Sequence, residues 1–450
     1  MERGSFGSKI GVVLATAGSA VGLGNVWRFP YMTGENGGAA FIIVYIGCML
    51  LLGIPGMISE FVVGRQAGSN AARAYGTLTK MGHWKLIGYL GILTSTLILG
   101  FYAVVAGWCL QYLFASMVGH LSGNADYVQS YFSDFSTNPW KPCFWAVAFI
   151  LITHLVVVRG VRRGIERVSN LLMPALLVLL LILVVASCML PGAYKGVEFL
   201  LKPDFSKLTG DVFLEALGQS FFSLSLGTAC LCTYASYFSK QTNLTRSAIQ
   251  IALLDSLIAI LAGLMIFPAA FSVGVEPDQG PSLIFITLPN VFNEAFSSVP
   301  VVGYVVSIMF YALLVFAALT STISMHEIGT AFFHEEMNMP RSKAAWILTL
   351  VCSVLAVLCS LSFGAYPQIQ LFGMSLLDFF DRLTADIMLP LGSLFTCLLV
   401  GWLVPKQIVY DQLTNWGSLQ SRLVGLYLVS VRFVCPLCII LIFLHRFGVI

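Results

Sequence analysis

The sequence is a succession of long apolar runs separated by short polar stretches. The runs lie at 10–34, 39–63, 86–118, 143–158, 168–190, 213–237, 247–274, 301–333, 344–362, 374–403 and 423–445. Helices of about these lengths cross the roughly 30 Å of hydrocarbon in a lipid bilayer. The pattern therefore predicts an all-α polytopic membrane protein with eleven transmembrane helices. A further apolar stretch at 281–296 is too short and too interrupted by proline to span, and we expect it to form a helical hairpin in an outer loop.

Two of the predicted spans are interrupted by small and polar residues at their centres, at Gly18–Pro30 and Ser220–Cys230. Such breaks are costly in hydrocarbon, where unpaired backbone groups cost several kcal/mol each. They fall in the first and sixth helices, so each opens a group of five. This arrangement is typical of transporters built from inverted repeats, whose binding sites lie near the bilayer midplane. Glycine-lined contacts between helices would look similar, but Asn25, Ser223 and Ser225 favour a binding site.

The chain is accordingly divided into three parts. Residues 1–190 are the first five-helix repeat, and residues 191–404 are the second, inverted repeat with the hairpin near 281–296. Residues 405–450 hold one extra helix, the eleventh.

The eighth predicted helix carries a cluster of small and polar residues at spacings of three and four, which places them on one face. The cluster consists of Ala317, Thr320, Ser321, Ser324 and Met325. Hydroxyl side chains also bond back to their own helix without any function, so by itself this pattern leaves a structural role open.

The seventh predicted helix contains Asp255 and no basic residue. A carboxylate at this depth is costly and marks a functional site by default. Its expected partner is a cation, and a hard ion such as sodium prefers oxygen ligands. The alternative is that Asp255 is protonated.

Composition supports the membrane assignment. The chain is 58% hydrophobic and 10% charged, with a mean hydropathy of +0.88, whereas soluble domains carry about 25% charged residues. A soluble fold could not cover this much apolar surface.

Charge predicts the orientation, because cytoplasmic loops are enriched in Lys and Arg. The basic residues fall in alternate loops: Arg65, Arg73, Lys80, Lys85, the segment Arg159–Arg167, Lys240, Arg246, Arg341, Lys343, Lys406 and Arg422. We therefore expect a protein of the cell inner membrane with a cytoplasmic N-terminus and an outer C-terminus. The net charge of +3 is spread without a basic patch, so we expect no nucleic-acid partner.

The motifs along the chain resemble the neurotransmitter:sodium symporter family, in particular its prokaryotic eleven-helix amino acid transporters. The matching motifs are Gly18–Pro30, Glu35–Gly38, Gly53–Pro55, Glu60, Gly64–Arg65, Tyr102, Trp108, Gln219–Phe222, Gly227, Tyr234–Tyr237, Phe285–Pro289 and Leu319–Ser321. They cover essentially the whole chain.

The resemblance implies two sodium ions, bound where the helices break. One site would use Ala20, Asn25, Ser223 and Asp255 together with the substrate carboxylate. The other would use Gly18, Val21, Ala317, Thr320 and Ser321.

The resemblance also implies a substrate pocket lined by Ala20, Gly22, Leu23, Gly24, Ile98, Tyr102, Phe222, Ser225, Thr228, Ser321 and Met325. The Tyr102 hydroxyl and the free amides of Leu23 and Gly24 would hold a carboxylate, which half-helix N-termini favour. Monoamine carriers of the family have an aspartate where this chain has Gly22, so the substrate here is expected to supply its own carboxylate, as an amino acid does.

Two departures from the family pattern refine this expectation. Chloride-independent bacterial members often have a glutamate at the position of Ala259, and the usual asparagine at the position of Asp255 is an aspartate here. One negative charge is thus retained, which predicts transport without chloride, although Tyr45, Gln219 and Ser223 would line any anion site. Thr228 and Ala229 replace a bulky residue and a glycine, and we expect a neutral, hydrophobic or aromatic substrate.

By the same resemblance, Arg28 and Asp381 would close the outer vestibule above Tyr102 and Phe222. At the inner face Arg3 would pair with Glu335, with Phe6 plugging beneath and Tyr237 nearby.

The sequence thus predicts a sodium-coupled symporter that imports a neutral amino acid by alternating access. Its partners would be the amino acid and the bilayer, with no obligatory protein partner. A proton-coupled carrier of the same fold is the main alternative. An ion channel is a lesser one, since it would need a continuous polar pore. We expect no enzymatic activity: His326 and His334 are eight residues apart, not four as in the helical zinc motif.

Overall fold

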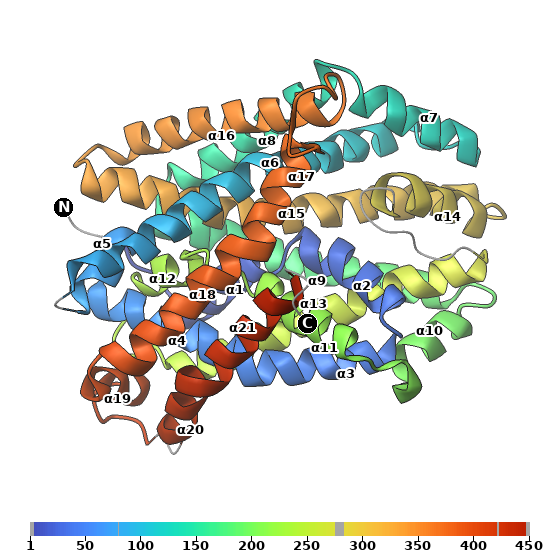
Figure 1. Ribbon diagram of the computed structural model, residues 1–450. Coiled ribbons are helices and arrows are strands. Elements are labelled where there is room, and N and C mark those ends of the chain that lie inside the picture. Colours follow the sequence, from blue (N-terminus) through green and yellow to red (C-terminus); the bar gives the residue numbers. More distant parts are fainter. Residues whose placement is uncertain (1–3, 80, 275–282, 421–422, 447–450) are drawn as a thin grey trace.

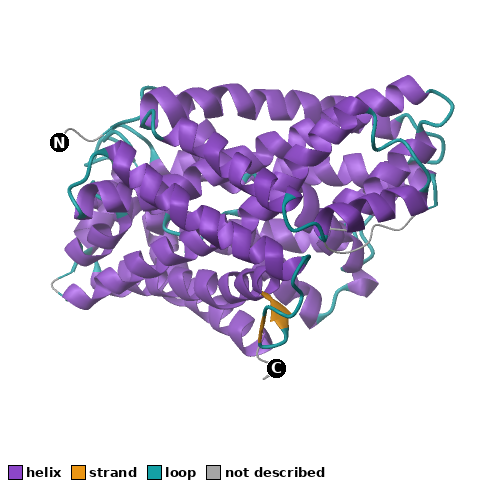
Figure 2. Cartoon of the chain, turned by 90° about the horizontal axis from the view of Figure 1, so that it is seen from above, coloured by secondary structure: helices purple, strands orange, loops and turns teal. Residues whose placement is uncertain are grey.

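The computed structural model describes residues 4–79, 81–274, 283–420 and 423–446. Nearly all of this part of the chain is helical (Figures 1 and 2). Its only two strands, β1 (Gln370–Leu371) and β2 (Met374–Ser375), form a small antiparallel hairpin.

The first half of the chain forms the first five predicted spans. Its helices and π- or 3₁₀-helical turns (η) are α1 (Lys9–Ala20), η1 (Gly24–Arg28), α2 (Phe29–Glu35), α3 (Ala39–Cys48), η2 (Met49–Gly53), α4 (Ile54–Ala67), α5 (Ala71–Thr77), η3 (Gly82–Trp84), α6 (Lys85–Val118), α7 (Ala125–Ser136), α8 (Lys141–Val157), η4 (Val161–Glu166) and α9 (Arg167–Cys188).

The second half forms the remaining spans and their connections. Its elements are α10 (Tyr194–Leu201), η5 (Phe205–Lys207), α11 (Gly210–Ser223), α12 (Cys230–Ala235), α13 (Leu244–Ser272), η6 (Leu283–Thr287), α14 (Leu288–Ala295), α15 (Pro300–Glu336), α16 (Arg341–Phe363), α17 (Leu376–Arg382), η7 (Leu383–Met388), α18 (Leu389–Leu398), η8 (Leu399–Leu403), α19 (Lys406–Thr414), α20 (Val424–Val429), η9 (Ser430–Val434) and α21 (Cys435–Arg446).

Each predicted span coincides with one helix or with a broken run of helices. Within the described ranges, eight helices are long and apolar enough to cross a membrane without a break. The first span is broken, with α1 and the helix that begins at Gly24 meeting at 56°. The eighth span, α15, is the longest helix at 37 residues. Apolar side chains cover the outside, as in Leu171, which is 70% exposed; a surface of this kind faces lipid.

The two halves pack reciprocally. The first span, α1 to α2, packs against α13 of the seventh span, while α11 and α12 of the sixth span pack against α3 and α4 of the second. The third and eighth spans, α6 and α15, pack against each other along their lengths. This packing of each half against the other is the inverted-repeat architecture. It places the two broken helices inside the bundle.

Two segments that the sequence placed between spans contain helical structure. The basic segment Arg159–Arg167, predicted as a loop, is largely helical: η4 continues directly into α9. Its Glu166 is buried and accepts hydrogen bonds from the Gly7 amide (2.7 Å) and the Ser8 hydroxyl (2.9 Å), which anchors the start of α1. The predicted hairpin at 281–296 is described only from residue 283, as η6 and α14, and the chain before it lies outside the described residues.

Candidate functional site

The sixth span loses its helical conformation between α11 and α12. Ser225, Gly227 and Ala229 have φ values of 53°, 82° and 61°, in the left-handed region that favours glycine. The freed backbone amides find a buried carboxylate on α4: Gly227 N–H donates to Glu60 Oε1 (2.7 Å) and Cys232 N–H to Glu60 Oε2 (3.3 Å). The sequence identified Glu60 only as part of a motif, and folding shows its role in satisfying this break.

A cavity of about 70 Å³ lies between the two broken helices. It is lined by ten of the eleven predicted pocket residues: Ala20, Gly22, Gly24, Ile98, Tyr102, Phe222, Ser225, Thr228, Ser321 and Met325. The eleventh, Leu23, is adjacent, because its N–H donates to the Tyr102 hydroxyl at 3.0 Å. The cavity is also lined by Ser223, which was predicted for the first ion site, and by five residues that the sequence assigned to no site: Ser19, Phe101, Cys230, Ser324 and Leu389. Four of them adjoin predicted residues or lie in the quoted clusters, but nothing marked Leu389 of the tenth span.

The two glycines of the first break allow close approach. A Cβ atom at Gly22 would lie 2.6 Å from Ser321 Oγ and 3.0 Å from Tyr102 Oη. One at Gly24 would lie 2.9 Å from the Phe222 ring. A side chain at either position would therefore enter the cavity wall.

Three of the four residues predicted for the first ion site form one buried cluster. Asn25 Nδ2 donates to Asp255 Oδ1 (2.8 Å) and lies 3.3 Å from Ser223 Oγ. Ser223 Oγ and Tyr45 Oη both donate to Asp255 Oδ2, at 2.7 and 3.2 Å. Ala20, the fourth predicted residue, lines the neighbouring cavity. The cluster is rich in oxygen ligands and includes a carboxylate, the chemistry that hard cations prefer.

The residues predicted for the second ion site also converge. Thr320 Oγ1 lies within hydrogen-bond distance of the carbonyl oxygens of Ala317 (3.0 Å) and Val21 (3.4 Å), and Ser321 Oγ donates to Val21 O (3.2 Å). A Cβ atom at Gly18 would lie 3.1 Å from Thr320 Cβ, so α1 and α15 touch here. The first break and the face of α15 thus enclose a set of carbonyl and hydroxyl oxygens.

Above the cavity, the guanidinium of Arg28 lies over the Phe222 ring, 4.3 Å from its centroid. Within the described part of the chain no ion pair joins Arg28 to Asp381. In this conformation the predicted outer pair is therefore not in direct contact, and Arg28 and Phe222 form the roof together.

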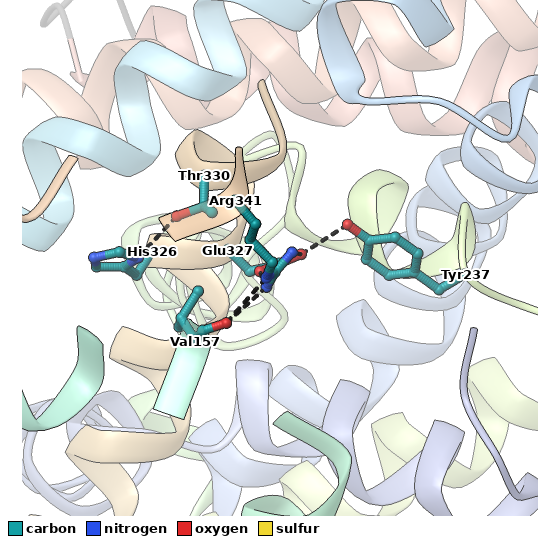
Figure 3. A network of polar contacts seen from close by, with 6 residues as sticks. All are labelled: Val157, Tyr237, His326, Glu327, Thr330 and Arg341. Atoms are coloured by element: carbon teal, nitrogen blue, oxygen red, sulfur yellow. Dashed lines mark hydrogen bonds and ion pairs between the residues drawn. The ribbon is translucent and has the colours of Figure 1, made fainter. Parts of the chain in front are cut away.

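Below the cavity, a buried ion pair joins the eighth and ninth spans (Figure 3). Glu327 of α15 pairs with Arg341 at the start of α16 and accepts a hydrogen bond from Tyr237 Oη (2.7 Å). Arg341 also donates to the carbonyl of Val157, at 3.1 Å from Nε and 2.9 Å from Nη2. The Glu327–Arg341 pair thus connects the fourth, eighth and ninth spans with the end of the sixth.

Three of the predicted inner residues, Phe6, Tyr237 and Glu335, lie near this ion pair. The Phe6 ring packs against the rings of Tyr234 and Tyr237, with centroids 5.9 and 6.3 Å apart. Glu335 accepts hydrogen bonds from the backbone and side chain of Asn70, at 2.8 and 3.1 Å. Arg3 lies outside the described residues. The sequence analysis did not assign Glu327 and Arg341 to the inner closure. The available signal was Glu327, an acidic residue inside a predicted span.

Comparison with known proteins identifies close relatives along the full chain. The profile of the sodium:neurotransmitter symporter family matches residues 3–137 and 140–449. An uncharacterized sodium-dependent transporter of Bacillus subtilis, YhdH, is 39% identical over 99% of this chain and 98% of its own. One from Haemophilus influenzae is 34% identical over 99% and 98%. The crystal structure of MhsT in complex with L-phenylalanine has a TM-score of 0.89 and 40% identity, and the match covers 98% of this chain and 99% of that one.

Proposed function

The chain belongs to the sodium:neurotransmitter symporter family, and from this premise we propose that it imports a neutral, hydrophobic or aromatic amino acid together with sodium. It is a sodium-dependent, multi-pass membrane transporter, not an enzyme. The substrate, the number of ions and the independence from chloride are the parts that we add.

The composition of the cavity carries the proposal of a neutral amino acid. None of its lining residues in the described chain is charged. A lone amine would therefore have no counter-ion, and a carboxylate-bearing substrate would find the tyrosine hydroxyl of Tyr102 and the amide-rich break beside Leu23. Ile98, Phe101 and Leu389 also line the cavity and suit an apolar side chain. The related structure of MhsT holds L-phenylalanine, an amino acid of this class.

We assign one sodium ion to each oxygen cluster. Asn25, Ser223 and Asp255, with the backbone of Ala20 and the substrate carboxylate, would bind the first. The carbonyls of Gly18, Val21 and Ala317 with the hydroxyls of Thr320 and Ser321 would bind the second. The shared carboxylate makes substrate binding depend on the first ion, which is the physical basis of coupling.

Independence from chloride is supported by the position of the Asp255 carboxylate. The hydroxyls of Tyr45 and Ser223, which would line an anion site, both donate to Asp255 Oδ2. The Asp255 carboxylate therefore occupies the donors that chloride would need. A proton taken up by Asp255 in place of sodium is the competing mechanism.

Alternating access would proceed between the two closures. Substrate and sodium would enter from outside past Arg28 and Asp381, and Phe222 and Tyr102 would then close over them. Release to the cytoplasm would require the Tyr237–Glu327–Arg341 contacts and the packing of Phe6 to separate, together with the predicted Arg3–Glu335 pair. We place the N-terminus in the cytoplasm, the C-terminus outside, and the protein in the cell inner membrane.

Binding of labelled L-phenylalanine to the purified protein tests this proposal. We expect binding in sodium and none in potassium, competition by neutral apolar amino acids, and loss in Asn25→Ala and Thr320→Ala. Thr96→Ala is the matched control, because the Thr96 hydroxyl bonds only back to Ile92 O within α6. Stronger competition by a charged amino acid would refute the substrate class, and binding in potassium that rises at low pH would favour proton coupling.

A further inference from the structure

A second, larger hollow lies on the outside of the bundle, away from the transport cavity. It measures about 580 Å³ and runs between the second span (α3, η2 and α4), the seventh (α13) and the eleventh (α20 and η9). Its walls are almost wholly aliphatic and face outward: Leu51 is 63%, Leu253 62% and Leu426 68% exposed. We call this hollow the outer groove.

Two π-helical turns shape the outer groove. The turns are η2 on one wall and η9 on the other, and both contribute lining residues. A π turn widens the helix and frees a carbonyl; here Ser430 Oγ donates to Leu51 O at 3.0 Å, across the groove's edge. Tyr427 likewise turns its hydroxyl to Ser59, at 2.8 Å. The hydroxyls of Ser430 and Tyr427 are thus hydrogen-bonded within the protein, and most of the wall is aliphatic.

At one end the outer groove opens into a polar mouth. This mouth has a volume of about 450 Å³ and shares Thr245, Ile249, Leu413 and Leu423 with the groove. It adds Asn243, Arg246, Gln250 and Gln420. Arg246 is exposed, and no hydrogen bond or ion pair engages its guanidinium within the residues that the structure describes. The mouth therefore carries an uncompensated positive charge beside amide groups.

We propose that the outer groove and its mouth bind one membrane phospholipid with an anionic headgroup. The lining of α13 extends from Thr245 to Ile260, fifteen residue steps or about 22 Å. This exceeds the roughly 15 Å of hydrocarbon in one leaflet, so the groove accommodates a whole acyl chain. The phosphate lies at Arg246, as expected for a basic recess at the end of transmembrane helices. The amphipathic shape and the single charge distinguish a lipid from the apolar face of another protein.

The walls of the outer groove contact the helices that form the first ion site. The η2 turn that lines the groove includes Gly53, where an added Cβ would lie 2.6 Å from the side chain of Leu224 at the break of the sixth span. On α13, Leu253 and Leu257 line the groove while Asp255 points into the ion cluster. An occupied groove thus supports the two helices that hold the first ion site.

Native mass spectrometry of the purified transporter tests the proposal, with phosphatidylglycerol and phosphatidylcholine of the same acyl chains as probes. We expect the wild type to retain phosphatidylglycerol about fivefold more strongly, the ratio expected for one arginine at an anionic surface. Arg246→Gln should abolish this preference and Leu257→Trp, which fills the groove, should weaken both lipids. Lys141→Gln and Leu181→Trp, exposed positions on α8 and α9, are the matched controls and should behave as wild type.

Three outcomes would overturn the proposal. One is equal retention of the two lipids by the wild type. Another is displacement of the lipid by glycerol phosphate alone, which would make the mouth a site for free phosphate. The third is a dimer that Leu257→Trp disrupts in lipid-free detergent, which would show that a second copy covers the groove. Leu253→Trp repeats the groove test should Leu257→Trp fail to fold.

Discussion

Gly22 has no side chain where two oxygens converge. In Gly22→Ala the new Cβ would lie 2.6 Å from Ser321 Oγ and 3.0 Å from Tyr102 Oη. Overpacking of this kind costs about 1–3 kcal/mol, so we expect the affinity for L-phenylalanine in sodium to fall about fivefold or more. Gly47→Ala on α3 is the control, because nothing lies within 4 Å of its Cβ position. Equal affinity of the two variants would show that the cavity wall is not where we place it.

The Tyr102 hydroxyl accepts a hydrogen bond from Leu23 N–H at 3.0 Å. Tyr102→Phe leaves this buried amide without its partner, which costs about 1–3 kcal/mol. We expect a higher KM for uptake with the protein still folded. Tyr112→Phe is the control, since the buried Tyr112 hydroxyl has no hydrogen-bond partner in the described chain. If both variants transport like the wild type, Tyr102 has no part in binding substrate.

The break in the sixth span depends on a carboxylate from another helix. Glu60→Gln replaces one acceptor oxygen by a donor, so either the Gly227 or the Cys232 amide loses its partner. We expect a loss of about 1–3 kcal/mol in stability, seen as a lower Tm in detergent. The exposed Glu198, whose carboxylate bonds only Lys202 among the described residues, gives the control Glu198→Gln. An unchanged Tm in Glu60→Gln would mean that the break is satisfied in another way.

The breaks in the first and sixth spans could be predicted from the sequence, whereas contacts between distant spans could not. The breaks were predictable because glycine, asparagine and serine interrupt an apolar run, which is costly in a membrane. The buried ion pair of Glu327 and Arg341, which the predicted Tyr237 contacts, was not predictable. Tyr237, Glu327 and Arg341 are separated by 90 and 14 residues and meet only when the spans pack. The sequence also does not predict the π turns η2 and η9, because most of their residues are as apolar as those of the helices around them.

Family resemblance supplied the ion and substrate residues, and the fold brings nearly all of them together. The predicted Arg28–Asp381 gate pair is the exception, because no ion pair joins the two residues in the described part of the chain. In the present conformation Arg28 rests on Phe222, and a charge pair across a moving gate is a property of one state rather than of the sequence.

For the transport cycle as a whole, we propose that the carboxylate of Asp255 takes the place of chloride. Asp255→Asn removes the charge that Tyr45 and Ser223 now hold, leaving two hydroxyl donors free for an anion. We expect wild-type uptake to be the same in chloride and gluconate, and the variant to require chloride. Uptake of the wild type that stops in gluconate would contradict this assignment.

The two sodium ions that we propose would also make the cycle energetically sufficient. Each ion contributes about 2.3 kcal/mol across 100 mV, and a tenfold sodium gradient adds about 1.4 kcal/mol. Two sodium ions moved with a zwitterion would thus supply about 7 kcal/mol, enough to accumulate the substrate about 10⁵-fold.

Uptake of labelled L-phenylalanine into proteoliposomes tests the central claim most directly. The protein is reconstituted, and accumulation is measured with an inward sodium gradient or with potassium in its place. We predict accumulation above the equilibrium level with sodium only, abolished in Asn25→Ala and Thr320→Ala and kept in Thr96→Ala. Equal uptake in sodium and potassium, or none of any neutral amino acid, would contradict sodium-coupled amino acid import.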